Sequence, residues 1–384
     1  MHMIKKSIYL LKKLEEKKNP LRLKKSALNI IEKVFSKIYD VGMLVVDRSS
    51  SILFVVICEF IYLFKRKYEN PKGVMICRYA EYDGHGIQES TEKLFLDDTI
   101  VKYLNKSNEF SIFLWDDNRP IVGFGINFYR KVMSSNPKHL ILSSYASGVF
   151  FQPMPWIVAR LKKRKIRTVA LWWDTCSAGA AKQMYPIVKA VDTHVILDNP
   201  VMDFDESNES KLLKNKALIL ICPYDVQIQS RVRDLDVVFL GQVTSYRDRR
   251  TSYLKFLAAN NVALYSSVSD RNEQCSHEMY YETLSRGKIG LSFSMSVDRY
   301  QFKGRVIETM LAGCLLLDER NMQTAYYFNE GEDYVAFSSE KELLEKIEYY
   351  LTHEDERIRI AESGMRKVKK QTAGKYFWDK VLSS

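Results

Sequence analysis

Lys303, Arg305 and Glu308 stand close together at the start of an apolar stretch, FKGRVIETMLAGCLLLDERN. The pattern predicts a helix from Arg305 to about residue 312, closed by Gly313 before a buried strand. Both cations would then flank the amino end of the helix, where backbone N–H groups and the helix dipole bind anions. Glu308 lies one turn further on, where a carboxylate can accept hydrogen bonds from both hydroxyls of a ribose.

Two explanations of these charges remain open at this point. Arg305 and Glu308 could form an ion pair on a solvated helix face, which contributes well under about 1 kcal/mol. A phosphate and sugar site is the other explanation, and an earlier stretch, VVFLGQVTSYRDRR, supports it. There Gly241 ends a strand ahead of a helix, which lets backbone approach a phosphate, and Arg249 adds positive charge. On its own, that stretch would equally fit a strand-ending glycine followed by solvated arginines.

Short apolar runs alternating with helical periodicity would position these residues. Such alternation predicts parallel sheets covered by helices, arranged as two consecutive α/β units that join near CPYDVQIQSRVRD. Ligands of open α/β sheets bind outside the carboxyl ends of the strands. The runs expected to be strands cover residues 73–80, 110–117, 139–145, 167–174 and 193–199 in the first unit, and 235–243, 261–267, 288–294, 313–319 and 333–339 in the second.

Length and composition are those of a globular protein of two domains. The chain has 384 residues, with 46% hydrophobic and 27% charged residues. Its six cysteines include no CxxC pair and mostly lie in apolar runs, which indicates reduced, buried thiols in a cytosolic protein and argues against a zinc site.

The positive charge of the chain is concentrated at its amino-terminal end. Residues 1–72 hold 16 Lys or Arg against 7 Asp or Glu, so +9 of the net charge of +11 lies there. Helical spacing of apolar residues predicts two amphipathic helices, broken near Pro20, that either lie on an anionic membrane surface or pack on the body of the protein. The apolar run at 52–64 is shorter than the roughly 20 residues of a membrane span. Nucleic-acid binding is the weaker explanation, because no recognised motif accompanies the charge.

The second unit resembles a known family. The stretches VFLGQVTSYRDRR, YYETLSRGKIGLSFS, FKGRVIETMLAGCLLLDERN and EGEDYVAFSS with the helical segment after it are similar to the donor half of GT-B glycosyltransferases, in particular the spore-maturation-protein-like subgroup. The resemblance implies an α/β fold of two Rossmann-like domains with an extra helical amino-terminal segment. The implied divisions are a basic helical extension (1–70), an acceptor domain (71–228), a nucleotide-sugar donor domain (229–366) and a closing helix (367–384). Phe377 and Trp378 of that helix are expected to pack on the first domain.

The same resemblance implies roles for individual residues. Glu308 corresponds to the ribose-binding glutamate of the family, and its phosphate-contacting cations correspond to Lys303, Arg305 and Arg249. Gly241 corresponds to the glycine beside the donor diphosphate. One position departs from the family pattern, because Tyr300 stands where many members carry an earlier glutamate.

The acceptor side is expected in loops that follow strands of the first unit. Asp83 and His85 lie in the loop EYDGHGIQES, and either can take a proton from an acceptor hydroxyl. Asp174 follows a strand and serves either in catalysis or as a helix N-cap. The tryptophans before it, Trp172 and Trp173, either stack on a sugar or pack in the core.

Together these observations predict a metal-independent glycosyltransferase that needs no cofactor. It would move a sugar from a UDP- or GDP-sugar to a hydroxyl of a cell-surface glycan, a lipid-linked sugar or a protein. The expected location is cytoplasmic, peripheral on the inner face of the membrane through residues 1–67, with no nucleic-acid partner. Two alternatives remain: an inactive GT-B-like protein that only binds nucleotides, and a basic α/β protein that binds nucleic acid.

Overall fold

A computed structural model describes both α/β units of the chain. The described residues are 73–80, 110–116, 128, 131–145, 158, 161–162, 164–173, 175, 185, 187–202, 207–224, 226, 228–241, 248–267, 277–294 and 299–384. The predicted amphipathic helices of residues 1–72 therefore lie outside the described residues.

The first unit contains a six-stranded parallel sheet in the order β2-β1-β3-β4-β5-β6. Its strands are β1 (Val74–Ala80), β2 (Phe110–Asp116), β3 (His139–Tyr145), β4 (Arg167–Trp173), β5 (Thr193–Ile196) and β6 (Ala217–Ile219). The central strands are buried on both faces, as runs such as THVI predict. Five of these strands coincide with predicted apolar runs, whereas the short edge strand β6 was missed.

The second unit contains a five-stranded parallel sheet in the order β11-β10-β9-β7-β8. Its strands are β7 (Leu235–Leu240), β8 (Leu264–Ser267), β9 (Gly287–Ser292), β10 (Leu315–Glu319) and β11 (Val335–Phe337). In both sheets the chain starts near the middle, adds one strand on one side and then crosses to the other side. The strand order therefore reverses between β1 and β3, and again between β7 and β9, which are the places where open α/β sheets bind ligands.

Helices connect the strands and cover the second sheet. Those with described bounds are α9 (Asn208–Lys216), α10 (Asp248–Ala259), α11 (His277–Arg286), α12 (Gly304–Leu311), α13 (Met322–Ala325), α14 (Glu340–Thr352), α15 (Glu354–Gln371) and α16 (Gly374–Ser383). Side chains cap several of them, including Ser207 at α9, Asn321 at α13 and Ser339 at α14. The prediction of parallel α/β sheets is thus confirmed, and two of the cysteines, Cys222 and Cys314, are free and buried as expected.

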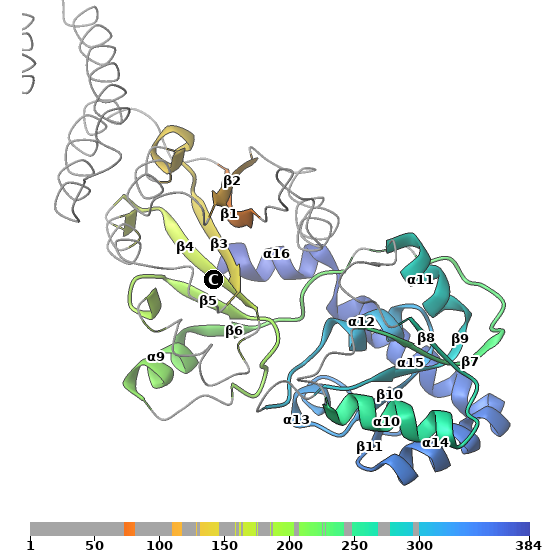
Figure 1. Cartoon of the computed structure of the whole chain (residues 1–384). Coiled ribbons are helices and arrows are strands. Elements are labelled where there is room, and N and C mark those ends of the chain that lie inside the picture. The colour runs from red at the N-terminus through yellow and green to blue at the C-terminus, as the bar shows by residue number, and fades with distance from the viewer. Residues whose placement is uncertain are drawn as a thin grey trace, which may run out of the picture.

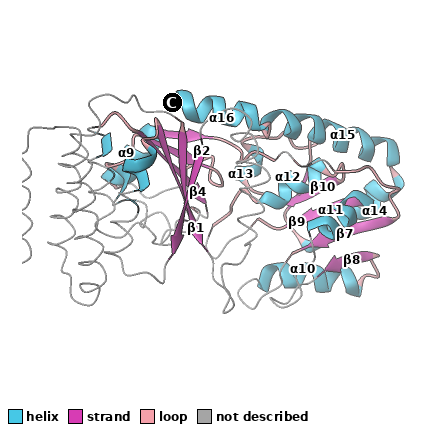
Figure 2. Ribbon diagram, turned by 90° about the horizontal axis from the view of Figure 1, so that it is seen from above, coloured by secondary structure: helices cyan, strands magenta, loops and turns pink. Residues whose placement is uncertain are grey.

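The carboxyl-terminal helix returns to the first sheet. Figure 1 shows the two sheets in separate lobes, with α16 beside the first, and Figure 2 shows α15 and α16 running along one side of both. Phe377 and Trp378 are fully buried and belong to a hydrophobic cluster that includes Ile141 and Leu171 of the first sheet. The same cluster contains Val306 of α12, so one apolar core continues from lobe to lobe.

The chain crosses between the lobes at two adjacent places. The first crossing is the linker that follows β6, and the second lies between α15 and α16. The backbone N–H of Tyr224 in the linker donates to the carbonyl oxygen of Thr372, at 3.0 Å, and both residues are buried. The two crossings are therefore bonded to each other.

Candidate functional site

Helix α12 carries three of the predicted site residues. It begins at Gly304, within one residue of the predicted start, and Lys303 is its N-cap with extended backbone and no side-chain capping hydrogen bond. Its apolar side chains, such as Val306 and Met310, are buried. The amphipathic pattern therefore fixes one face of α12 on the sheet and leaves its positive amino end facing the carboxyl ends of the strands.

Arg305 lies at the point where the strand order of the second sheet reverses. Its Nε donates to the carbonyl oxygen of Leu240, the last residue of β7, at 2.7 Å. Its guanidinium carbon lies 4.9 Å from the ring centroid of Phe239, within the range of a cation–π contact. A Cβ atom on Gly241 would lie 2.1 Å from Nη2 of Arg305. A larger residue at position 241 would therefore displace the end of the Arg305 side chain, a contact that the sequence pattern alone did not reveal.

Glu308 is held by two tyrosine hydroxyls. Tyr280 of α11 donates to its Oε2 at 2.5 Å, and Tyr224 of the linker donates to its Oε1 at 3.3 Å. Burial first, and then the charge of Glu308, raises the pKa of both hydroxyls well above the usual value, so both remain donors. Gly304 leaves room for Tyr224, since a Cβ there would lie 2.7 Å from the hydroxyl oxygen. Each carboxylate oxygen keeps acceptor capacity for a further hydroxyl.

Arg249 pairs with a carboxylate at the carboxyl end of the second sheet, and its predicted contact with a phosphate stays a prediction. Its Nε forms an ion pair with Oε1 of Glu319, the buried last residue of β10. The adjacent Arg250 faces the sheet instead: it is 3% exposed, its Nη2 donates to the Phe293 carbonyl at 3.3 Å, and its guanidinium carbon lies 5.4 Å from the Phe239 ring centroid. Arg250 therefore shares the Phe239 ring with the arginine of α12.

Helix spacing alone does not distinguish the two arginines. The buried residues Tyr253 and Leu257 lie three and seven positions after Arg250 and four and eight positions after Arg249, and both spacings fit one helix face. The structure separates them, because Arg250 is buried whereas the Arg249 side chain is half exposed.

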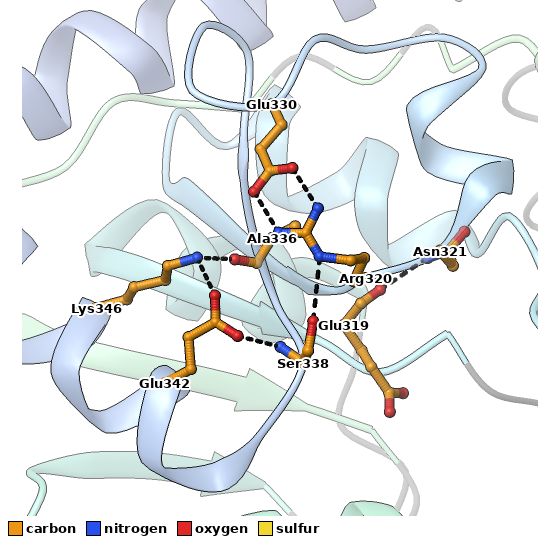
Figure 3. Close-up of polar contacts among 8 residues, drawn as sticks. All are labelled: Glu319, Arg320, Asn321, Glu330, Ala336, Ser338, Glu342 and Lys346. Carbon is orange, nitrogen blue, oxygen red and sulfur yellow. Dashed lines mark hydrogen bonds and ion pairs between the residues drawn. The ribbon is translucent and has the colours of Figure 1, made fainter.

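Ion pairs hold the loops after β10 and β11 together. Arg320 donates to both oxygens of Glu330, at 2.6 and 2.7 Å, and to the hydroxyl of Ser338 at 3.1 Å. Glu342 accepts from the Ser338 backbone N–H and pairs with Lys346. Figure 3 shows this group, and it shows the Glu319 carboxylate pointing away from Arg320 and Glu330. These contacts fix the carboxyl ends of β10 and β11 relative to each other.

The predicted acceptor residues cannot be placed in the same way. Asp83, His85 and Asp174 lie outside the described residues, and the strands that precede them end at Ala80 and Trp173. Their suggested roles stay predictions.

Trp172 is a core residue, so the suggestion that it stacks on a sugar is wrong. It is 1% exposed, and its Nε1 donates to Nδ1 of His194 at 2.8 Å. Side chains alternate between the two faces of a strand, and Trp173 is only partly buried.

The described residues contain neither a metal-binding cluster nor a membrane-spanning helix. No group of three or more His, Cys, Asp or Glu side chains that could hold a metal ion occurs among them. No described helix is long and apolar enough to cross a membrane.

Comparison with known proteins shows similarity to glycosyltransferases in the sequence of the second domain and in the fold. Residues 229–382, less than half of the chain, match a family model described as glycosyl transferase-like. The fold is similar to that of a glycosyltransferase from Rickettsia africae, at a TM-score of 0.51 and 12% identity over 82% of this chain and 98% of that one. No curated protein matches the sequence.

Two further solved structures share the fold. Anabaena HepE in complex with UDP matches with a TM-score of 0.55 and 9% identity, covering 81% of this chain and 100% of that one. Sucrose-phosphate synthase from Thermosynechococcus elongatus matches with a TM-score of 0.52 and 9% identity, covering 82% and 100%. At such low identity these similarities show the fold alone. The chain therefore has the GT-B fold of these proteins, and its residues 229–382 match a glycosyl transferase-like family model.

Proposed function

We propose that the protein is a glycosyltransferase that uses a nucleotide-diphosphate sugar as donor. The observation that carries this proposal is the arrangement at the start of α12. Lys303 and Arg305 stand at the positive end of the helix, beside the carboxyl end of β7, and Glu308 lies one turn away. Cations at a helix amino end bind a diphosphate, and the carboxylate accepts from ribose hydroxyls.

UDP-sugars are the proposed donors, with GDP-sugars as the next class. Structures of the similar-fold protein HepE contain UDP and UDP-glucose, which supports a uridine donor here. Gly241 has no Cβ that would displace the Arg305 guanidinium, so this side chain can stand beside the diphosphate. Arg249, which is paired with Glu319, would contribute further positive charge at the edge of the site. The reaction needs no metal in this proposal, since cations of the chain neutralise the leaving diphosphate.

The acceptor would be a hydroxyl of a cell-surface glycan, a lipid-linked sugar or a protein. Asp83, His85 or Asp174 is proposed as the base that takes its proton. The basic residues 1–67 are proposed to hold the enzyme at the cytoplasmic face of an anionic membrane, and the spore-maturation-like subgroup remains the proposed relationship.

A thermal-shift comparison tests the donor site. We expect UDP or GDP to raise the unfolding temperature of the wild type, because a ligand at about 100 times its Kd adds about 2.7 kcal/mol. Glu308→Gln and Arg305→Met should abolish the shift. Glu342→Gln is the matched control, since it changes a hydrogen-bonded glutamate of the same domain that lies elsewhere, and it should retain the shift.

Two results would argue against the proposal. Folded wild type that no nucleoside diphosphate stabilises would remove its main support. A shift that survives both site substitutions would place the nucleotide elsewhere. Release of UDP from a UDP-sugar then distinguishes a transferase from a protein that only binds nucleotides.

A further inference from the structure

A polar cluster, buried apart from a half-buried lysine, joins the two domains. We define it as Thr175, Asp198, Gln301 and Lys303. Asp198 follows β5 of the first sheet, and its Oδ1 and Oδ2 accept from the hydroxyl and the backbone N–H of Thr175, at 2.7 and 2.8 Å. Its Oδ2 also accepts from Nε2 of Gln301 of the second domain, at 2.7 Å. Lys303 in turn donates from Nζ to Oε1 of Gln301.

The chemistry of the cluster fixes the orientation of the Gln301 amide. A carboxylate only accepts hydrogen bonds and an ammonium only donates them. The amide therefore has to turn its NH2 group to Asp198 and its oxygen to Lys303. Its side chain cannot easily escape, because Gln301 is 4% exposed and Asp198 5%. The backbone adds a further tie, since the N–H of Phe302 donates to the Asp198 carbonyl at 2.9 Å.

Gln301 thus connects a carboxylate of one domain with a cation at the start of α12 in the other. Holding the long lysine side chain in one place reduces the rotamer entropy that ligand binding must remove.

We propose that Gln301 is a positioning residue of the donor site, which orients Lys303 toward the diphosphate through its bond to Asp198 of the first domain. This inference rests on the proposed function. It means that the phosphate site is complete only when the two domains stand as observed here.

The chain offers a matched control for this role. Gln323 of α13 is also buried, at 3% exposure, and also joins the two domains: its Nε2 donates to Oδ1 of Asn199 at 2.9 Å, and its Oε1 accepts from the Val201 N–H at 3.2 Å. Among the described residues, the hydrogen-bond partners of its amide belong to the first domain and include no cation of α12. Removing either amide therefore weakens the domain contact, whereas only Gln301 bears on Lys303.

The test measures UDP binding by titration calorimetry in the full chain. The variants are Gln301→Leu, Gln323→Leu, Lys303→Met and the double variant Gln301→Leu/Lys303→Met. We expect Gln301→Leu to weaken binding about tenfold, as the loss of a charge-assisted hydrogen bond does. Gln323→Leu should change affinity less than about twofold, although both should lower the unfolding temperature. In the Lys303→Met background, Gln301→Leu should cause no further loss.

Each contrary outcome is distinct. Equal losses for Gln301→Leu and Gln323→Leu would show that only the domain contact matters, and would overturn the inference. Additive losses in the double variant would show that Gln301 does not act through Lys303, with the same consequence. Wild type that binds neither UDP nor GDP would instead refute the proposed function, and the inference with it. If the Gln301→Leu variant failed to fold while the Gln323→Leu variant folded, Gln301 would be a structural residue. That result would also overturn the inference.

Discussion

Arg305 and Glu308 are three positions apart on α12, yet each contacts groups that are remote in sequence. The partner of Arg305 is the carbonyl of Leu240, and those of Glu308 are Tyr280 and Tyr224. Helix spacing was sufficient to select both charged residues from the sequence. It could not reveal partners that lie 28 and 84 positions from Glu308, because those contacts depend on how the linker and α11 pack.

The tyrosine contacts predict a measurable effect on the carboxylate. Tyr280→Phe removes only the hydroxyl that donates to Glu308 at 2.5 Å, so the carboxylate keeps only the longer hydrogen bond from Tyr224 and is held less firmly. We expect UDP affinity to fall about threefold to tenfold, as for a lost hydrogen bond to a charged group. Isothermal titration with UDP measures the change.

A tyrosine elsewhere serves as the control for this prediction. Tyr349 donates to Glu356 at 2.9 Å on the exposed side of the second domain, so Tyr349→Phe removes a similar hydrogen bond without touching the site. Its UDP affinity should match that of the wild type. If Tyr280→Phe bound UDP as tightly as Tyr349→Phe, the hydroxyl would have no part in positioning Glu308.

At the scale of elements, the apolar pattern identified where the strands lie in the chain but not the order in which they pair in the sheets. Ten apolar runs were assigned to strands that the structure contains, because a strand buried on both faces needs an uninterrupted apolar run. Strand β6 (Ala217–Ile219) was missed because a three-residue edge strand leaves little pattern. The order in which strands pair depends on packing between distant residues, so the two switch points became visible only in the fold.

The bond between β4 and β5 predicts a pH dependence of stability. Burial lowers the pKa of His194 to about 4, and its neutral ring accepts from Trp172. In the unfolded chain the same histidine titrates near 6.5. Between these values the unfolded chain binds the extra proton, so the free energy of unfolding should fall as the pH falls from about 6.5 to about 4, by at most about 3 kcal/mol from this group.

Chemical denaturation at several pH values measures this dependence. His194→Gln does not titrate, so its stability should fall less steeply on acidification than that of the wild type. Parallel curves for the two proteins would mean that His194 does not carry the predicted linkage.

At the scale of the whole molecule, the last helix belongs to the core of the first lobe. Trp378 is fully buried in the cluster that also contains Val169 and Val195. Trp378→Ala should therefore lower the free energy of unfolding by about 3–5 kcal/mol. The loss should appear in the first domain, although the substitution lies near the end of the chain. Hydrogen exchange should speed up in peptides of β4 and β5 and change little in β7 and β9.

An exposed aromatic residue of the same helix provides the comparison. Tyr376 is 49% exposed, and Tyr376→Ala should leave exchange in both sheets nearly unchanged. Faster exchange confined to the second sheet in Trp378→Ala would contradict the assignment of α16 to the first lobe.

The two α/β units could be predicted from the sequence, whereas the acceptor site could be predicted only as a set of alternative residues. Helix-terminal charges have a local signature, so Lys303, Arg305 and Glu308 could be selected by spacing. An acceptor site is built from loops without periodicity, and its three candidate residues lie outside the described part of the chain. The basic residues 1–72 also lie outside the described part of the chain, so their contact with an anionic membrane stays a prediction.

The return of α16 to the first lobe also has a consequence for biosynthesis. A ribosome adds about 5–20 residues per second and releases the amino-terminal domain first. The strands β1 to β6 therefore emerge well before Phe377 and Trp378, the side chains that complete their core. Until α16 arrives, the nascent first lobe has an uncovered apolar surface, which makes it a natural client for a chaperone during translation.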